Sequence, residues 1–133
     1  MKYDKGSIIK KSNIIFKGTN KLDFRIGGHP VVLSHSFDYD DEYIYFLTLS
    51  SRDDLYVEEP LRYYLVKPDK NNKLKKPSII DLKYIYKDKN SNIPETGILK
   101  NFDYKEMLKK LIAYQGTNPD SYFEEISTVL SAE

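Results

Sequence analysis

Short apolar runs separated by polar turns fill most of the chain up to about residue 100. The two strongest runs cover residues 30–34 and 43–50, are rich in β-branched and aromatic side chains, and are separated by an acidic turn. Such runs predict buried β-strands. Weaker runs of the same kind cover residues 7–16, 61–67 and, with a bend, 78–86, while loops are predicted at 17–28 and 87–95. Because no helical pattern intervenes, the spacing predicts antiparallel pairing in a small β-barrel over about residues 4 to 100.

Two helices are predicted after the last strand. Asp103 and Glu106 have the spacing of a capping box, and the helical apolar stripe that follows them ends before Gly116, a favourable residue after a helix. Asn118 then stands as a second cap before Pro119, which suits a first helical position. These signals predict helices at about residues 103–115 and 119–131. We expect the whole chain, residues 1–133, to form one mostly β domain with C-terminal helices.

Composition narrows the class of protein. The net charge is +1, from 21 basic and 20 acidic residues, whereas a protein that coats duplex DNA is usually more basic. Cysteine is absent, which excludes disulfides and thiolate metal sites and fits a reducing compartment. The sequence contains no apolar run of membrane-spanning length, and its N-terminal residues lack the apolar stretch of a signal peptide. We therefore expect a cytoplasmic protein that does not enter a membrane.

The two histidines, His29 and His35, flank the run at residues 30–34. Histidine titrates near neutral pH and suits proton transfer. In a regular strand the two side chains would point to one face but lie about 20 Å apart, so direct two-histidine catalysis is not expected. Two surface histidines at the ends of a strand remain the simpler alternative.

Other polar residues suggest phosphate binding. Ser50, Ser51 and Arg52 end the strongest strand, where hydroxyls and a guanidinium can bind a phosphate through charge-assisted hydrogen bonds. The loop at residues 17–28 carries three basic residues, Lys17, Lys21 and Arg25. A plain turn and a solvated loop are the alternatives. There is no phosphate-binding glycine loop, no HExxH and no cluster of metal ligands, so no cofactor and no metal are expected.

The order of these signals resembles the MazF/PemK family of ribonuclease toxins over about residues 4 to 115. The family opens with a Lys/Arg-Gly-Asp-Ile type strand, which residues 5–9 approximate. Its Gly-x-Arg-Pro-Val-Val-Val-Leu-Ser strand corresponds here to Gly27-Gly28-His29-Pro30-Val31-Val32-Leu33-Ser34. The strand that ends in Pro-Ile-Thr-Ser corresponds to residues 48–51, and the Ser-Val-Val-Asp-Leu strand corresponds to residues 78–82. The family's last strand and helix correspond to residues 96–100 and to the helix at Asp103.

The resemblance implies a small antiparallel barrel of the MazF/PemK/CcdB toxin type that cleaves single-stranded RNA without a metal. In that reaction the ribose 2′-hydroxyl attacks the adjacent phosphorus and leaves a 2′,3′-cyclic phosphate and a 5′-hydroxyl. By position, His29 replaces the family's arginine, and Ser50 takes the place of its hydroxyl. We therefore expect His29, Ser50 and Arg52 to be catalytic, with His29 as general acid or base and Arg52 or Arg25 as the fixed charge.

The remaining expected roles and partners follow from the same resemblance. RNA or phosphate binding is assigned to Lys17, Lys21, Arg25, Ser51 and His35. A homodimer and an antitoxin, more readily a protein than an RNA, are the implied partners. Two alternatives stay open: a ToxN/AbiQ-type ribonuclease inhibited by a repeat RNA, and a non-catalytic barrel that binds protein or nucleic acid. The gyrase poison CcdB shares the type of fold, but its Trp-Gly-Ile end is missing here.

Overall fold

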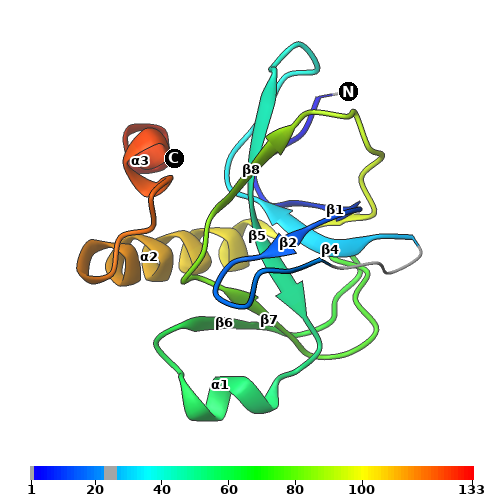
Figure 1. The fold of residues 1–133 in the computed structure, drawn as a ribbon. Helices are drawn as coiled ribbons and strands as arrows, with labels where there is room; N and C mark the ends of the chain where they lie inside the picture. The colour runs from blue at the N-terminus through cyan, green and yellow to red at the C-terminus, as the bar shows by residue number, and fades with distance from the viewer. Residues whose placement is uncertain (1, 23–26) are drawn as a thin grey trace.

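The computed structural model describes residues 2–22 and 27–133 (Figure 1). In this part of the chain a mostly antiparallel β-sheet curls into a half-barrel, and helices follow at the C-terminal end. The strands are β1 (Ser7–Lys11), β2 (Ile15–Phe16), β3 (Lys21–Leu22), β4 (His29–Leu33), β5 (Tyr43–Ser50), β6 (Tyr63–Val66), β7 (Ser78–Asp81), β8 (Tyr86–Lys89) and β9 (Gly97–Ile98). The helices are α1 (Asp54–Glu58), α2 (Asn101–Thr117) and α3 (Phe123–Ser131).

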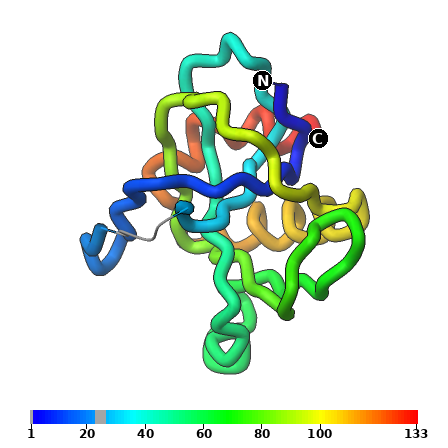
Figure 2. The backbone as a smooth tube through the Cα atoms, turned by 90° about the vertical axis from the view of Figure 1, so that its right-hand side faces the viewer, coloured from blue at the N-terminus to red at the C-terminus, as the bar shows by residue number. Residues whose placement is uncertain are grey.

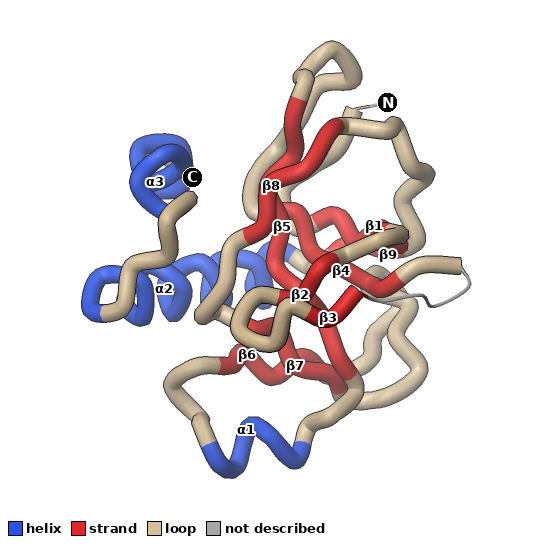
Figure 3. Tube along the Cα trace, in the orientation of Figure 1, coloured by secondary structure: helices blue, strands red, loops and turns tan. Residues whose placement is uncertain are grey.

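The long strand β5 organises the sheet. Among the described residues the main sheet has seven strands in the order β6-β7-β5-β4-β1-β9, with β8 also paired to β5, and β2 and β3 form a separate hairpin (Figure 3). The first half of β5 pairs with β8, its middle with β4, and its last two residues, Leu49 and Ser50, pair with β7. All of these pairings are antiparallel, as the sequence predicts. Because β5 changes partners along its length, the sheet curls around it.

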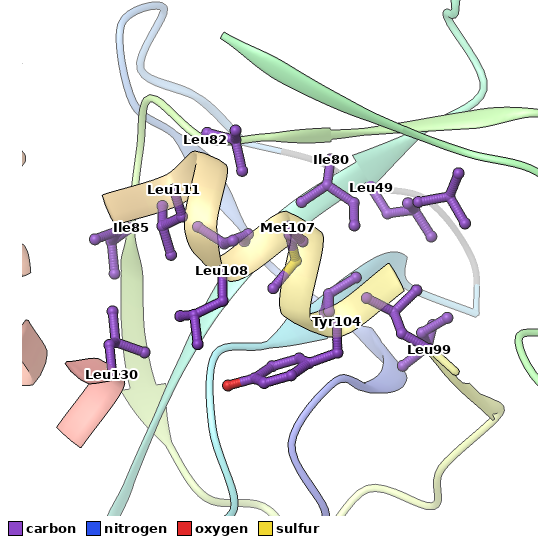
Figure 4. Close-up of a cluster of buried hydrophobic side chains, with 14 of the residues drawn as sticks. Leu49, Ile80, Leu82, Ile85, Leu99, Tyr104, Met107, Leu108, Leu111 and Leu130 are labelled. Atoms are coloured by element: carbon purple, nitrogen blue, oxygen red, sulfur yellow. The ribbon is translucent and has the colours of Figure 1, made fainter. Parts of the chain in front are cut away.

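The two faces of the sheet carry different hydrophobic clusters because side chains alternate along a strand. On one face, Val32 and Leu47 belong to a cluster with Met107 and Leu111 of α2. Figure 4 shows part of this cluster, to which α3 adds Leu130. On the other face, neighbouring residues such as Val31 and Phe46 form a second cluster with Tyr3, Phe37 and Tyr86. The β2–β3 hairpin lies over this second face, on the side opposite α2 (Figure 2).

The predicted caps of α2 are wrong. The helix begins at Asn101, with Lys100 as its N-cap residue and no side-chain capping bond. Asp103 does not cap the helix, because its carboxylate accepts a 2.6 Å hydrogen bond from the Tyr64 hydroxyl. At the other end the helix runs through Gly116 to Thr117, since one glycine costs a helix only about 1 kcal/mol.

The second C-terminal helix starts later than predicted. Its N-cap residue is Tyr122, so Asn118 and Pro119 lie in the connection, where Asn118 ends α2. The Asp120 carboxylate accepts the backbone N–H of Tyr122 at 3.0 Å, and its own N–H donates to the Gln115 side chain at 2.6 Å. These local bonds fix a compact corner in place of a first helical turn.

Three boundaries of the predicted strands and loops also change. The predicted first strand is divided into β1 and β2, and the predicted loop at residues 17–28 contains β3. The predicted loop at residues 87–95 begins as β8. The short helix α1 was not predicted and buries none of its residues, which explains why it leaves no apolar stripe. No helix in the described part of the chain is long and apolar enough to cross a membrane.

Candidate functional site

Strand register brings His29 and Ser50 together. In the β4–β5 ladder Val31 pairs with Thr48, so continuing the antiparallel register by two residues sets His29 opposite Ser50. Both side chains then point to the sheet face that α2 does not cover, because they alternate with the residues that contact α2. Residues 21 positions apart in the sequence thus meet at one end of the half-barrel.

A cavity of about 450 Å³ lies on this face, between the ends of the strands and the β2–β3 hairpin. Three of its lining residues, His29, Ser50 and Arg52, are those that we expected to be catalytic, and Lys17 lines it as well. Four of its lining residues are aromatic, and we refer to them as the aromatic wall: Phe16, Tyr63, Tyr84 and Tyr86. The volume is within the range of pockets that hold small ligands, which runs from about 300 to 1,000 Å³.

The His29 side chain is held inside this cavity. The residue is 7% exposed, and its ring meets the ring of Phe16 edge-on, with 5.1 Å between the centroids. The Ser50 hydroxyl accepts the backbone N–H of Arg52 at 3.1 Å, which fixes the turn that follows β5. A hydroxyl oxygen that accepts one bond can still donate its own proton, so Ser50 can hydrogen-bond to an anion.

Arg52 lies at the exposed rim. Its guanidinium donates two hydrogen bonds to the Asp54 carboxylate, both 3.0 Å long. These bonds raise the pKa of Arg52 and lower the pKa of Asp54. An ion pair at the surface contributes little to stability, so a phosphate can displace Asp54 from the guanidinium at small cost.

Arg62 is a third cationic residue of the cavity, and the sequence reasoning missed it. Its guanidinium makes two hydrogen bonds to Asp81, 3.0 and 2.9 Å long, and lies over the rings of Tyr63 and Tyr84. The bonds to Asp81 raise the pKa of Arg62. Its third nitrogen, Nη1, makes a longer bond of 3.5 Å to Glu59. Because a guanidinium has five N–H donors, others are left for a ligand. A charged residue at the start of a predicted strand was the available signal, but it is equally typical of a solvated strand end.

The Lys17 side chain has structural partners on other parts of the chain. Its ammonium donates to the Ile85 carbonyl oxygen at 2.6 Å and to both oxygens of Asp120, at 3.0 and 3.1 Å. It also lies 4.4 Å from the ring centroid of Tyr122. The Lys17 backbone N–H donates to the Tyr86 hydroxyl at 3.0 Å. These contacts join the hairpin to the corner between α2 and α3. They therefore hold in place the side of the cavity that the hairpin forms.

The other residues expected to bind RNA are distributed differently. Ser51 lines a neighbouring cavity of about 350 Å³, together with His29, Ser50 and Arg52. Lys21 is exposed on β3, outside both cavities. Arg25 lies outside the described residues.

His35 lines neither cavity. Strand β4 ends at Leu33, so the two histidines are not joined by one regular strand. His35 is 8% exposed and its ring packs 4.1 Å from that of Phe37. Its Nδ1 lies 2.7 Å from the Ser34 hydroxyl oxygen. Burial lowers the pKa of His35 to about 4, so the ring is neutral at pH 7.

Comparisons with known proteins leave the family open. No protein-family model matches the chain, and no curated protein sequence is significantly similar to it. Within the described residues, no group of three or more His, Asp or Glu side chains is placed to hold a metal ion.

Proposed function

We propose that this protein is a metal-independent endoribonuclease of the MazF/PemK toxin type that cleaves single-stranded RNA. The observation that carries the proposal is the meeting of His29, Ser50 and Arg52 at one cavity. A proton-transfer group, a hydroxyl and a fixed positive charge are what phosphodiester transfer by a neighbouring hydroxyl requires. The proposal includes the expected cellular setting: a cytoplasmic homodimer that a protein antitoxin neutralises.

In the proposed reaction the 2′-oxygen forms a bond to phosphorus and the bond from phosphorus to the 5′-oxygen breaks. One proton leaves the 2′-hydroxyl and one reaches the departing oxygen. His29 transfers one of these protons, and solvent exchanges the other. Arg52 and Arg62 offset the negative charge that develops on the phosphorane, and the Ser50 hydroxyl donates to one of its oxygens. Arg62 adds a second fixed charge beside Arg52.

The test is incubation of the purified protein with a long single-stranded RNA, with and without EDTA. We expect cleavage in both, with products that polynucleotide kinase can label directly because they carry 5′-hydroxyl ends. His29→Ala should lower the rate by about 100-fold or more, the usual contribution of a proton-transfer group. The matched control is His35→Gln, which changes the other histidine, outside both cavities, and can keep the hydrogen bond to Ser34. A His29→Ala protein that cuts RNA at the wild-type rate would refute the catalytic assignment of His29.

A non-catalytic binding barrel is the second candidate, and one observation favours it. The guanidiniums of Arg52 and Arg62 are each paired with a carboxylate, which reduces the positive charge available to a transition state. A protein of this kind would retain RNA or a partner protein in the same cavity without cutting. Filter binding of intact RNA that persists undegraded for hours would support this candidate over the nuclease. A ToxN/AbiQ-type ribonuclease would cut the RNA and be inhibited by a repeat RNA.

A further inference from the structure

The two neighbouring cavities meet at the same strand ends. The first, of about 450 Å³, and the second, of about 350 Å³, share His29, Ser50 and Arg52. Their other lining residues come from opposite faces of the sheet. Thr48 and Asp81 belong to the first cavity, whereas Leu49 and Ser78 belong to the second. Because side chains alternate along a strand, the two cavities lie on opposite faces of the sheet. The three shared residues, where β4 begins and β5 ends, form the ridge between them.

The two cavities differ in character. The larger one has the aromatic wall, to which the hairpin contributes Phe16 and the bend before β8 contributes Tyr84. Aromatic side chains bind unpaired bases of any sequence by stacking. The smaller one is lined by Pro30, Leu49 and Leu74 together with serine residues. Its surface offers apolar contact and hydroxyl groups without an aromatic ring, so it provides a weaker binding surface for a base.

We propose that the two cavities hold the two nucleosides on either side of a single phosphate, which lies on the ridge at His29, Ser50 and Arg52. This inference rests on the proposed function. A phosphodiester has one nucleoside on each side, and the ridge carries the groups suited to its charge. Both volumes fall within the range of small-ligand pockets. The minimal ligand is therefore a dinucleoside monophosphate, with the tighter hold on the base that enters the aromatic cavity.

The experiment measures binding with a ligand that cannot be cut. Each 2′-O-methyl dinucleoside monophosphate is titrated into the full-length protein and followed by NMR chemical shifts, beside the 3′- and 5′-monophosphates of the same nucleosides. We expect at least one dinucleotide to bind about tenfold more tightly than either of its mononucleotides. Tyr84→Leu should weaken binding of that dinucleotide about tenfold, which is the effect expected from the loss of one stacked base. Tyr39→Leu is the matched control, because Tyr39 is 68% exposed and lines neither cavity.

The smaller cavity is tested separately by filling it. Ser51→Tyr should bring the affinity for the dinucleotide down to that for the better mononucleotide. Phe16→Leu replaces Tyr84→Leu as the aromatic-wall variant if the latter does not fold. Equal affinities for dinucleotides and mononucleotides in the wild-type protein would overturn the inference, and so would a Ser51→Tyr protein that keeps the full dinucleotide advantage. Failure of the proposed function looks different: the dinucleotide binds as described, but the wild-type protein leaves RNA intact.

Discussion

Acid should destabilise this protein through His35. Burial holds the pKa of the folded residue at about 4, against an ordinary value of 6.5, although the nearby charge of Asp41 acts in the opposite direction. Between these two values the unfolded chain binds a proton at His35 that the folded protein does not bind. Lowering the pH therefore favours unfolding. The stability that depends on neutral His35 is present above pH 6.5, is lost as the pH falls, and changes no further below about pH 4.

The size of the effect follows from the two pKa values. Their difference corresponds to about 3 kcal/mol once the pH is below both of them. From pH 7 to pH 4.5 the loss is about 2 kcal/mol, a large part of the roughly 5 to 15 kcal/mol that stabilises a typical domain. His35 is 8% exposed and its ring packs against Phe37, so a charged ring would be desolvated there.

The assay is urea unfolding followed by circular dichroism at pH 7 and pH 4.5. Carboxylates also respond to pH, so the wild-type protein is compared with His35→Gln, which can hydrogen-bond to Ser34 but does not titrate. Between the two pH values, we expect the wild-type protein to lose about 2 kcal/mol more than the variant does. Equal losses in the two proteins would refute the reasoning, whatever the stability of the variant at pH 7.

Three further predictions concern the framework around the site. Asp120→Ala should speed amide hydrogen exchange across residues 15–22, because it removes the anchor of Lys17; unchanged exchange contradicts that anchoring role. Gly116→Ala should raise stability by about 0.5 to 1 kcal/mol in thermal melts, since Gly116 lies inside α2 with open space around it, whereas a loss would mean that the helix ends there. Leu111→Ala should cost about 2 to 5 kcal/mol, and Val57→Ala, on exposed α1, less than about 0.5; similar costs would refute the core assignment.

Sequence patterns predicted the strands that are buried on both faces. Strand β5 has the predicted bounds, Tyr43–Ser50, and β4 differs from the predicted run at residues 30–34 by one position at each end. In both, continuous apolar side chains of high β-propensity leave little alternative to a central strand. The short strands β3 and β8 could not be predicted in this way, because exposed polar residues fill much of their length. The pairing of β8 also depends on β5, which lies 40 or more positions earlier in the chain.

The candidate site was predictable in part. The resemblance to the toxin family pointed to His29, Ser50 and Arg52, and the structure brings these three together. Arg62 was missed because its partner Asp81 is 19 positions away, and neither residue is distinctive alone. Lys17 illustrates the same difficulty, since its ammonium is held by Asp120, 103 positions later. A sequence shows which side chains are charged, but the tertiary partners of those charges decide whether they face a ligand.

Because Asp120 anchors the hairpin, the site cannot be complete before Asp120 has been synthesised. The ribosome makes the chain from the N-terminus, so His29 and Ser50 emerge well before Tyr86, and Tyr86 before the corner between α2 and α3. The cavity lacks Tyr86 until β8 is made, and the hairpin that lines it is not anchored until Asp120 follows. For a protein that we propose to cut RNA, the site is completed only after the ribosome has added Asp120, 91 positions after His29.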